Sequence, residues 1–259
     1  MNNKNRQLGL IFSRRDVLAL FRAAGTAILV VGCIPRKSSS TQAKSSVAVP
    51  RSSAANSATL PACVLSPEQT EGPYFVDEKL NRSDIRSDPV DGSVKDGVPL
   101  YLTLQVSQIG STGCTPLAGA IVDVWHCDAL GVYSDVTDQS FSTVGQKFLR
   151  GYQVSNANGT VQFTTIYPGW YQGRTVHIHF KVRTDGTSGQ PYEFTSQLYF
   201  DDSITDQVHT QTLYASKGQR TQKNADDGIF QGDGDQMLLK LTKNGQGYAA
   251  TFDIGLRIT

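Results

Sequence analysis

The sequence predicts an all-β fold, an immunoglobulin-like or transthyretin-like β-sandwich with irregular loops and at most short helices. Residues 100–106 and 248–256 support this class, because apolar side chains alternate there with polar or aromatic ones, as in strands with one buried face. Turn-forming residues separate such segments at short, regular intervals, which favours a sandwich over an α/β barrel. The chain contains no internal repeat, phosphate-binding loop or heptad pattern that would indicate another class.

The amino-terminal segment, residues 1–33, is predicted to be an export signal. Arg14 and Arg15 precede an apolar run over residues 23–31, which ends just before Cys33. This order is typical of a twin-arginine signal with a lipoprotein-type cleavage site. A transmembrane helix is the alternative, but a span needs ~20 apolar residues, and Arg22 blocks extension of the run. We therefore expect an exported protein, either membrane-anchored through a lipid on Cys33 or secreted or periplasmic.

The next segment, residues 34–60, consists mainly of Ser, Ala and Thr with scattered basic residues. It has too few large apolar side chains to bury a core, so it is predicted to be a disordered tether to one domain, residues 61–259. The first 60 residues carry nine basic side chains and one acidic one, a net of +8; the whole chain carries +1, so the remainder carries −7. A mildly acidic domain argues against nucleic acid as a partner.

The four cysteines are Cys33, Cys63, Cys114 and Cys127. If Cys33 is lipidated, three remain in an oxidising compartment, so one disulfide and one buried thiol is the simplest expectation. Cys114 and Cys127 flank a predicted strand over residues 118–126, whose length keeps its ends far apart. Cys63 is therefore the expected partner of one of them, and the connectivity stays open. The spacing of the cysteines matches no zinc motif.

Three features in the rest of the domain are expected to be structural. Residues 151–155 and 160–166 flank Asn156 to Gly159, which is a signal for a β-hairpin. One short helix is predicted near residues 203–216, capped by Asp202 or Ser203 and carrying His209 on the surface. The glycine-rich acidic cluster lacks the regular spacing and final Glu of a calcium loop, so we expect a solvated loop containing Asp226, Asp227, Asp233 and Asp235.

The strongest signal for a functional site is the His177-Ile-His179 pair. In a strand alternate side chains share a face, so the two imidazoles point the same way while Ile178 points into the core. Such a pair is also compatible with surface or hydrogen-bonded histidines. Tyr171 follows a Pro-Gly turn that can fold it back over the strand. A phenolate beside imidazoles suits a ferric ion better than zinc or calcium, which predicts an Fe(III) site.

Here the chain resembles the intradiol ring-cleavage dioxygenases, which use non-haem Fe(III) to open catechols, as in the catechol and protocatechuate dioxygenases. The resemblance runs from about Cys63 to about Phe200 and rests on several motifs, which are Pro67-Glu-Gln-Thr-Glu-Gly-Pro-Tyr74, Val122-Asp-Val-Trp-His-Cys-Asp-Ala-Leu-Gly-Val-Tyr133-Ser-Asp, Phe148-Leu-Arg-Gly and the Tyr171 to His179 stretch. It implies four metal ligands, namely Tyr133, Tyr171, His177 and His179.

The resemblance also implies roles for residues that do not bind the metal. Arg174 matches an Arg held against the substrate, and Gln197 matches a polar residue near the bound catechol. Tyr171 would also take a substrate proton. Tyr74 would line the substrate pocket, although simple packing is the alternative. His126 is expected to support the site or the fold rather than to bind metal.

The chain departs from the best-known members in two ways. Only residues 172–176 separate the second Tyr from the first His, where those members carry a longer insertion, and no helical dimerisation segment precedes the domain. It resembles an exported, single-domain subgroup, so the catechol and the oligomeric state stay open.

The implied reaction is oxidative intradiol cleavage of a catechol by O2 to a cis,cis-muconate-type diacid, as in the catabolism of aromatic compounds. It needs Fe(III), a small-molecule catechol and O2 as partners, and no flavin or nicotinamide. The alternative is an exported, non-enzymatic β-sandwich binding module whose His-x-His pair holds copper, zinc or nothing, because one fold serves many functions. A metal-dependent hydrolase is a weaker alternative, since phenolate ligands reduce Lewis acidity.

Overall fold

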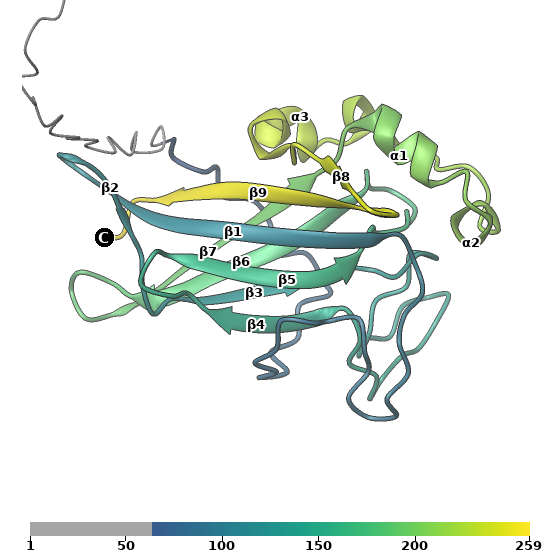
Figure 1. Cartoon of the computed structure of the whole chain (residues 1–259), viewed down its shortest axis with the longest axis horizontal. Coiled ribbons are helices and arrows are strands. Elements are labelled where there is room, and N and C mark those ends of the chain that lie inside the picture. Colours follow the sequence, from purple (N-terminus) through teal and green to yellow (C-terminus); the bar gives the residue numbers. More distant parts are fainter. Residues whose placement is uncertain (1–63) are drawn as a thin grey trace, which may run out of the picture. The chain divides into compact units, whose positions relative to one another are not determined.

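The computed structural model describes residues 64–259, which form two β-sheets and a few short helices (Figure 1). The predicted export signal, tether and domain start at residue 61 lie outside these residues. The strands are β1 (Pro99–Gly110), β2 (Gly113–Pro116), β3 (Ile121–Trp125), β4 (Arg150–Val154), β5 (Thr160–Ile166), β6 (His177–Asp185), β7 (Pro191–Tyr199), β8 (Thr242–Asn244) and β9 (Gly247–Leu256). The helices are α1 (Asp202–Val208), α2 (Thr212–Ala215) and α3 (Phe230–Asp233), with single 3-10 turns η1 (Asn224–Asp226) and η2 (Gly234–Met237).

The first sheet is built around the long strand β1. The strand order is β2-β1-β9-β8, and β5 also pairs with β1. The pairing of β1 with β9 is parallel, with Leu100 opposite Tyr248, whereas β2 and β5 run antiparallel to β1. The second sheet has the order β4-β3-β6-β7 and is antiparallel throughout. Figure 1 shows β1 and β9 side by side and the helices grouped on one side of the sheets.

One hydrophobic core takes side chains from both sheets. The alternation predicted for residues 100–106 is present: Leu100, Leu102 and Leu104 are buried from β1, and Phe180 and Val182 are buried from β6. Full burial of such a side chain stabilises the folded state by roughly 1.5–3 kcal/mol. The all-β prediction with at most short helices is therefore confirmed, while the narrower immunoglobulin-like or transthyretin-like assignment stays a prediction.

The predicted hairpin around Asn156 is wrong. The turn itself forms, since Gly159 N donates to Asn156 O at 2.9 Å, but β4 and β5 belong to different sheets. A Cβ on Gly159 would lie 2.2 Å from Val106 O, so the turn packs directly against β1. Because β5 pairs with β1 along its whole length, the turn carries the chain from one sheet to the other.

The helical prediction after β7 is correct in kind but wrong in extent. Two helices form, and Asp201 rather than Asp202 or Ser203 caps the first by accepting from Ser203 N and Ile204 N. Thr210 Oγ1 donates to Gln207 O at 2.7 Å, a local side-chain bond that competes with continuation of the helix.

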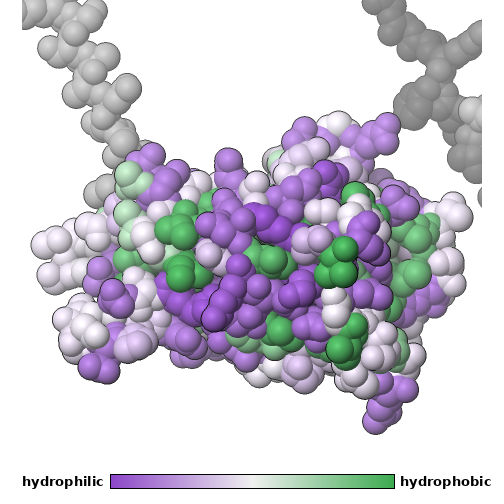
Figure 2. Space-filling model, turned by 90° about the horizontal axis from the view of Figure 1, so that it is seen from below, coloured by the Kyte–Doolittle hydropathy of each residue, from purple (hydrophilic) through white to green (hydrophobic). Residues whose placement is uncertain are grey.

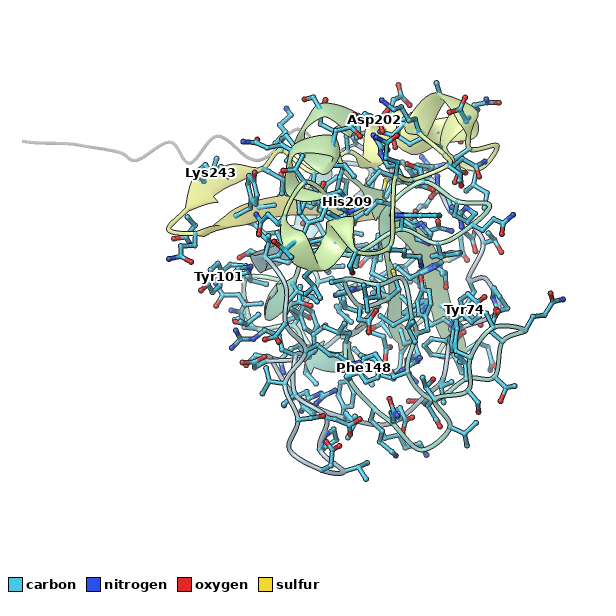
Figure 3. The ribbon with its side chains drawn as sticks, turned by 90° about the vertical axis from the view of Figure 1, so that its right-hand side faces the viewer. Tyr74, Tyr101, Phe148, Asp202, His209 and Lys243 are labelled. Atoms are coloured by element: carbon cyan, nitrogen blue, oxygen red, sulfur yellow. The ribbon has the colours of Figure 1, made fainter. Side chains whose placement is uncertain are left out.

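His209 is partly buried, not at the surface as expected. Its ring stacks on Tyr214 with centroids 5.2 Å apart, and Nε2 donates to Pro168 O. Figure 3 shows His209 on the helical side of the molecule, well apart from Tyr74. It therefore packs the helices against the sheets and takes no part in the candidate site.

Cys114 is disulfide-bonded, and Cys127 is a buried free thiol. This agrees with the expectation of one disulfide and one buried thiol. Cys63 and Cys33 lie outside the described residues, so the predicted pairing with Cys63 stays a prediction. Within residues 64–259 no helix is both long and apolar enough to cross a membrane.

The face shown in Figure 2 is mostly polar. Its hydrophobic side chains appear in separate groups between polar ones. Scattered exposed apolar side chains of this kind are normal on a protein surface, so this face indicates no particular partner.

Candidate metal centre

Two imidazoles converge at the start of β6. His177 and His179 are both 1% exposed, and their Nε2 atoms lie 3.0 Å apart. The indole of Trp125, the neighbour of His179 across the β3–β6 pair, stacks on the His179 ring with centroids 4.9 Å apart and planes at 6°. Strand alternation therefore places both rings on one face, as predicted, and the stacked indole fixes one ring plane.

The protonation of His177 follows from its hydrogen bonds. Its Nδ1 lies 2.7 Å from Thr175 O, and a carbonyl only accepts, so Nδ1 carries the proton and Nε2 presents a lone pair. Burial lowers the pKa of His177 to about 3 and the pKa of His179 well below its ordinary value. Both rings are neutral near pH 7, which is the form that binds a metal.

Two phenols complete the cluster. Tyr171 Oη lies 3.2 Å from His177 Nε2 and donates to it. The Tyr133 hydroxyl is buried and has no hydrogen-bond partner among the described residues, and its ring lies 5.6 Å from that of Tyr171. Burial raises the pKa of both phenols, and for Tyr133 the neighbouring Tyr171 adds to the rise.

This donor set fits a hard cation. The Nε2 atoms of His177 and His179 lie only 3.0 Å apart, and the buried Tyr133 hydroxyl has no partner among the described residues, which is costly unless another group completes the site. Phenolate oxygen with imidazole nitrogen suits a ferric ion. No group of three or more His, Cys, Asp or Glu in residues 64–259 could hold a metal, so the phenol-containing cluster is the candidate centre of the described chain.

Arg174 lies beside this cluster and is fixed by two acceptors. Its Nη2 donates to Gln197 Oε1 at 2.6 Å, and its Nε donates to Asp227 Oδ2 at 2.8 Å. Gln197 is opposite His179 in the β6–β7 register and donates to Thr70 O at 2.8 Å. The structure therefore brings together all of the predicted site residues, which are Tyr133, Tyr171, Arg174, His177, His179 and Gln197.

Asp227 corrects the prediction of a solvated acidic loop. It is 1% exposed, whereas the other carboxylates of that cluster, on Asp226, Asp233 and Asp235, are exposed as expected. Burial opposes ionisation of Asp227, but the Thr175 N–H and Arg174 outweigh it and lower the pKa of the carboxyl below its ordinary value. No local sequence signal separates Asp227 from Asp226.

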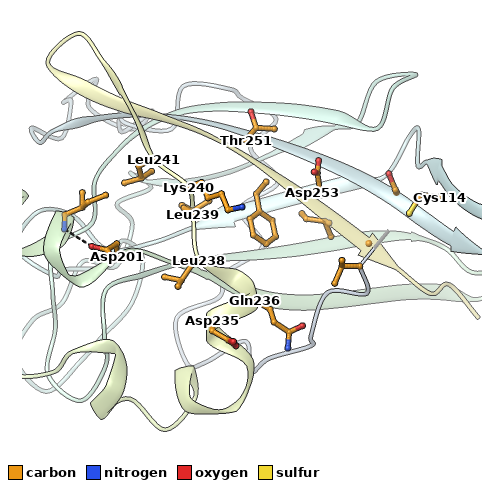
Figure 4. Close-up of a pocket in the computed structure, with 16 residues that line it drawn as sticks. Cys114, Asp201, Asp235, Gln236, Leu238, Leu239, Lys240, Leu241, Thr251 and Asp253 are labelled. Carbon is orange, nitrogen blue, oxygen red and sulfur yellow. Dashed lines mark hydrogen bonds between the residues drawn. The ribbon is translucent and has the colours of Figure 1, made fainter. Parts of the chain in front are cut away.

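Tyr74 packs against a candidate ligand and also lines a cavity. Its ring stacks on Tyr133 with centroids 4.5 Å apart, and its hydroxyl donates to Asp138 Oδ2 at 2.5 Å. Tyr74, Asp138 and Tyr171 also line a cavity of about 450 Å³. A larger cavity of about 830 Å³ lies between β9 and residues 235–241 (Figure 4), but its lining includes none of the predicted site residues. The smaller cavity is therefore the one that opens onto the cluster.

His126 is buried but is not positioned as a ligand. Its Nδ1 donates to Cys127 O at 2.8 Å, so Nε2 accepts from Thr165 Oγ1 at 2.6 Å. Both ring nitrogens are used, which supports the expected structural role.

Comparison with known proteins identifies the family of this chain. The family model described as Dioxygenase matches residues 70–228. The chain belongs to the intradiol ring-cleavage dioxygenase family. The matched segment contains every candidate ligand, Arg174 and Gln197, and it extends just far enough to include Asp227.

The curated relatives of this dioxygenase family match over part of their length. Chlorocatechol 1,2-dioxygenase of Pseudomonas sp. (strain P51) is 34% identical over 104 residues, covering 33% of this chain and 38% of that protein. The protocatechuate 3,4-dioxygenase beta chain of Burkholderia cepacia is 31% identical over 117 residues, covering 42% of this chain and 48% of that protein. The chain thus spans less than half the length of either relative.

Two solved dioxygenase structures are similar over nearly their whole length. An intradiol ring-cleavage dioxygenase from Tetranychus urticae has a TM-score of 0.64 and 32% identity, over 75% of this chain and 95% of that one. The dioxygenase domain of a carbohydrate-binding fusion protein from Streptomyces sp. SirexAA-E has a TM-score of 0.53 and 28% identity, over 76% of this chain and 100% of that one.

Proposed function

We propose that the chain catalyses Fe(III)-dependent cleavage of a catechol-type ring by dioxygen, between the two hydroxyl-bearing carbons. The observation that carries the proposal is the convergence of Tyr171 Oη, His177 Nε2 and His179 Nε2, at 3.2 and 3.0 Å, beside the unpartnered Tyr133 hydroxyl. Family membership supports it. Both oxygen atoms would be retained in a cis,cis-muconate-type diacid.

The ferric ion would be held by Tyr133, Tyr171, His177 and His179. When bound, it would make a chelated catechol reactive toward triplet dioxygen, which does not readily attack a closed-shell ring. The phenols of the protein alone keep their protons, because burial raises their pKa. A cation between them reverses that preference by stabilising the phenolate form.

Tyr171 is placed to exchange a proton with the substrate. It lines the cavity of about 450 Å³, and its hydroxyl also contacts His177 Nε2, so it faces both the incoming catechol and the imidazoles. We infer that its phenolic oxygen accepts one catechol proton. Tyr74 forms part of the same wall and supplies an aromatic face for the ring.

Arg174 supplies a fixed positive charge beside the site. Two acceptors hold the guanidinium, so little reorganisation is needed when negative charge develops on the ring and the incoming oxygen. Gln197 on β7 positions the Arg174 guanidinium by accepting from Nη2. Its own side-chain N–H donates to Thr70 O, which links β7 to the segment before β1.

The direct test is oxygenation of catechol under ¹⁸O₂ by the purified, iron-loaded protein. The proposal expects a ring-opened dicarboxylate that carries two ¹⁸O atoms. Two phenolate ligands also predict a visible charge-transfer band that changes when catechol binds anaerobically. A colourless protein that carries stoichiometric zinc or copper and consumes no oxygen would contradict the proposal.

The alternative of a non-enzymatic exported binding module is not favoured by the family match. It would give a protein that binds metal through the His-x-His pair and leaves catechol unchanged under oxygen, so the same experiment separates the two.

We also propose that the protein is exported as a lipoprotein. The proposal rests on Arg14, Arg15 and Cys33 in the amino-terminal sequence. Changing both arginines to lysine should retain the protein in the cytoplasm, and Cys33→Ala should release it from the membrane fraction with its activity intact. A parent protein found only in the soluble cytoplasm would contradict both expectations.

A further inference from the structure

The Asp227 carboxylate lies behind Arg174 and accepts four N–H groups. Arg174 Nε and Thr175 N donate to Oδ2 at 2.8 and 2.7 Å, and Ile229 N and Phe230 N donate to Oδ1 at 2.9 and 3.2 Å. A buried carboxylate is costly unless it is paired and hydrogen-bonded, and here both oxygens are satisfied. The short segment after η1 therefore holds Asp227 rigidly.

Asp227 and Gln197 hold the guanidinium at two different atoms. Gln197 accepts from Nη2, and Asp227 accepts from Nε, so the plane of the group is set from two sides. A single neutral acceptor would leave the plane free to turn about one bond. The Arg174 side chain is 16% exposed. Its guanidinium therefore pairs with the buried Asp227 while part of the side chain remains accessible to solvent.

The same carboxylate also reaches the strand that carries the histidines. Asp227 Oδ2 accepts from Thr175 N, and Thr175 O accepts from His177 Nδ1. One oxygen atom thus ties Arg174 to the backbone that orients a candidate metal ligand. Exposed carboxylates of the same segment, such as Asp235, have no such contacts with the site.

We propose that Asp227 is a positioning residue for Arg174, fixing the guanidinium plane toward the place where substrate charge develops. The inference rests on the proposed ring-cleaving function. Asp227 itself does not touch the candidate ligands, so it acts through Arg174.

A double-mutant cycle with Arg174 tests this role. Iron-loaded parent, Asp227→Asn, Arg174→Ala and the double variant are compared for kcat and KM with catechol and O2. Loss of a group that supports a metal site from outside its ligands typically costs roughly 10–100-fold in metal affinity or activity. We expect Asp227→Asn to lower kcat in that range with iron content unchanged, and to cost no more than about twofold when Arg174 is already Ala.

Equal losses in the two backgrounds, or loss of iron from Asp227→Asn, would overturn the positioning role. Asp235→Asn removes an exposed carboxylate from the same segment and should match the parent. If Asp227→Asn does not fold, Asp227→Glu keeps the charge at a displaced position and replaces it in the same cycle. A smaller loss of kcat in the Arg174→Ala background than in the parent supports the positioning role, and equal losses contradict it.

A second measurement does not depend on activity. In the metal-free parent, the Arg174 Nε–H should give a sharp, slowly exchanging NMR signal, assigned by its loss in Arg174→Ala, and Asp227→Asn should broaden it through exchange. An Arg174 Nε–H signal that is already broadened by exchange in the parent would overturn the inference. A parent with a sharp signal that consumes no oxygen with catechol would instead show that the proposed function is wrong.

Discussion

The Arg174 guanidinium contacts no candidate ligand directly, and its two partners hold it at the edge of the cluster. Arg174→Ala should therefore keep iron and colour but lose ~10²–10³ in the rate of the oxygen step, as expected for a preorganised donor. Arg174→Lys should recover only part of the rate, because an ammonium keeps the charge without the planar fork. Single-turnover oxygenation of an anaerobic enzyme–catechol complex measures this step.

Two outcomes would contradict this role for Arg174. If Arg174→Ala reacts with oxygen at the parental rate and only binds catechol more weakly, the residue serves binding. If it loses iron, the residue supports the strand that begins at His177.

The candidate ligands should differ in how much iron their loss removes. His177 and His179 sit on a strand with no flexible neighbour to replace them, so His177→Ala and His179→Ala should each lose most of the iron. Tyr171→Phe should keep some iron. In the proposed role Tyr171 accepts a proton from the substrate and so stops binding the metal, which means that the other ligands must hold the iron without it. Iron per chain after iron-replete growth measures the difference. Normal iron content and turnover in both His variants would refute the site.

The sequence could predict four of the site residues together because they lie in one motif, whereas Tyr133 and Gln197 followed from the family resemblance. Tyr171, Arg174 and the two histidines fall within nine positions, and strand alternation alone puts His177 and His179 on one face. Asp227 was missed because it lies 53 residues from Arg174 and reaches it only through the helices after β7. An Asp that serves an ion pair is indistinguishable, in one sequence, from its solvated neighbour Asp226.

At the scale of elements, β6 has two faces with different tasks. His177 and His179 point to the candidate centre, while Ile178, Phe180 and Val182 are fully buried in the shared core. Ile178→Ala should lower the free energy of unfolding by about 2–5 kcal/mol, because it deletes buried methyl groups and leaves a cavity. Urea unfolding measures the loss.

A matched control for Ile178 is available on β9. Thr251 is exposed, so Thr251→Ala should change stability by no more than about 0.5 kcal/mol. At temperatures where Ile178→Ala remains folded it should still bind iron, because its side chain lies on the opposite face. A loss of less than about 1 kcal/mol would show that the core at β6 relaxes around the change.

Element boundaries and pairings were harder to predict than the elements. Alternation located β1 and β9, because burial of one face leaves a period of two in the sequence. The turn at Asn156 was also correct locally, yet its strands separate, because all of β5 pairs with the long β1 while β4 pairs with β3. Pairing is a property of the whole sheet, which a turn motif does not contain.

At the scale of the molecule, stability should depend on the protonation of Asp123. Burial raises the pKa of Asp123 to about 6, even though Arg183 donates to both of its oxygens. The folded state therefore binds this proton more tightly than the unfolded state, whose Asp has a pKa near 3.9. Between about pH 4 and 6, the contribution of Asp123 to the unfolding free energy should fall as pH rises, by at most about 1.4 kcal/mol per pH unit.

Asp123→Asn isolates that contribution. Subtracting its pH profile of unfolding free energy from that of the parent should leave a difference that changes only within this window, with the parent losing stability relative to Asp123→Asn toward neutral pH. A difference that instead grows in favour of the parent as pH rises would mean that Arg183 outweighs burial and lowers the pKa of Asp123.

All of the candidate site residues lie in the described part of the chain. The shared core, both sheets and all candidate ligands lie within residues 64–259, and the family match begins at residue 70. A chain that begins at Pro61 should therefore fold and bind iron without the preceding residues, and it keeps Cys63 available for the predicted disulfide with Cys114, since Cys127 is a free thiol. Cooperative urea unfolding and one iron per chain, both equal to the full-length values, are the expected results. Insolubility of this shortened chain, or iron binding only in its full-length counterpart, would show that residues before Pro61 belong to the folded domain.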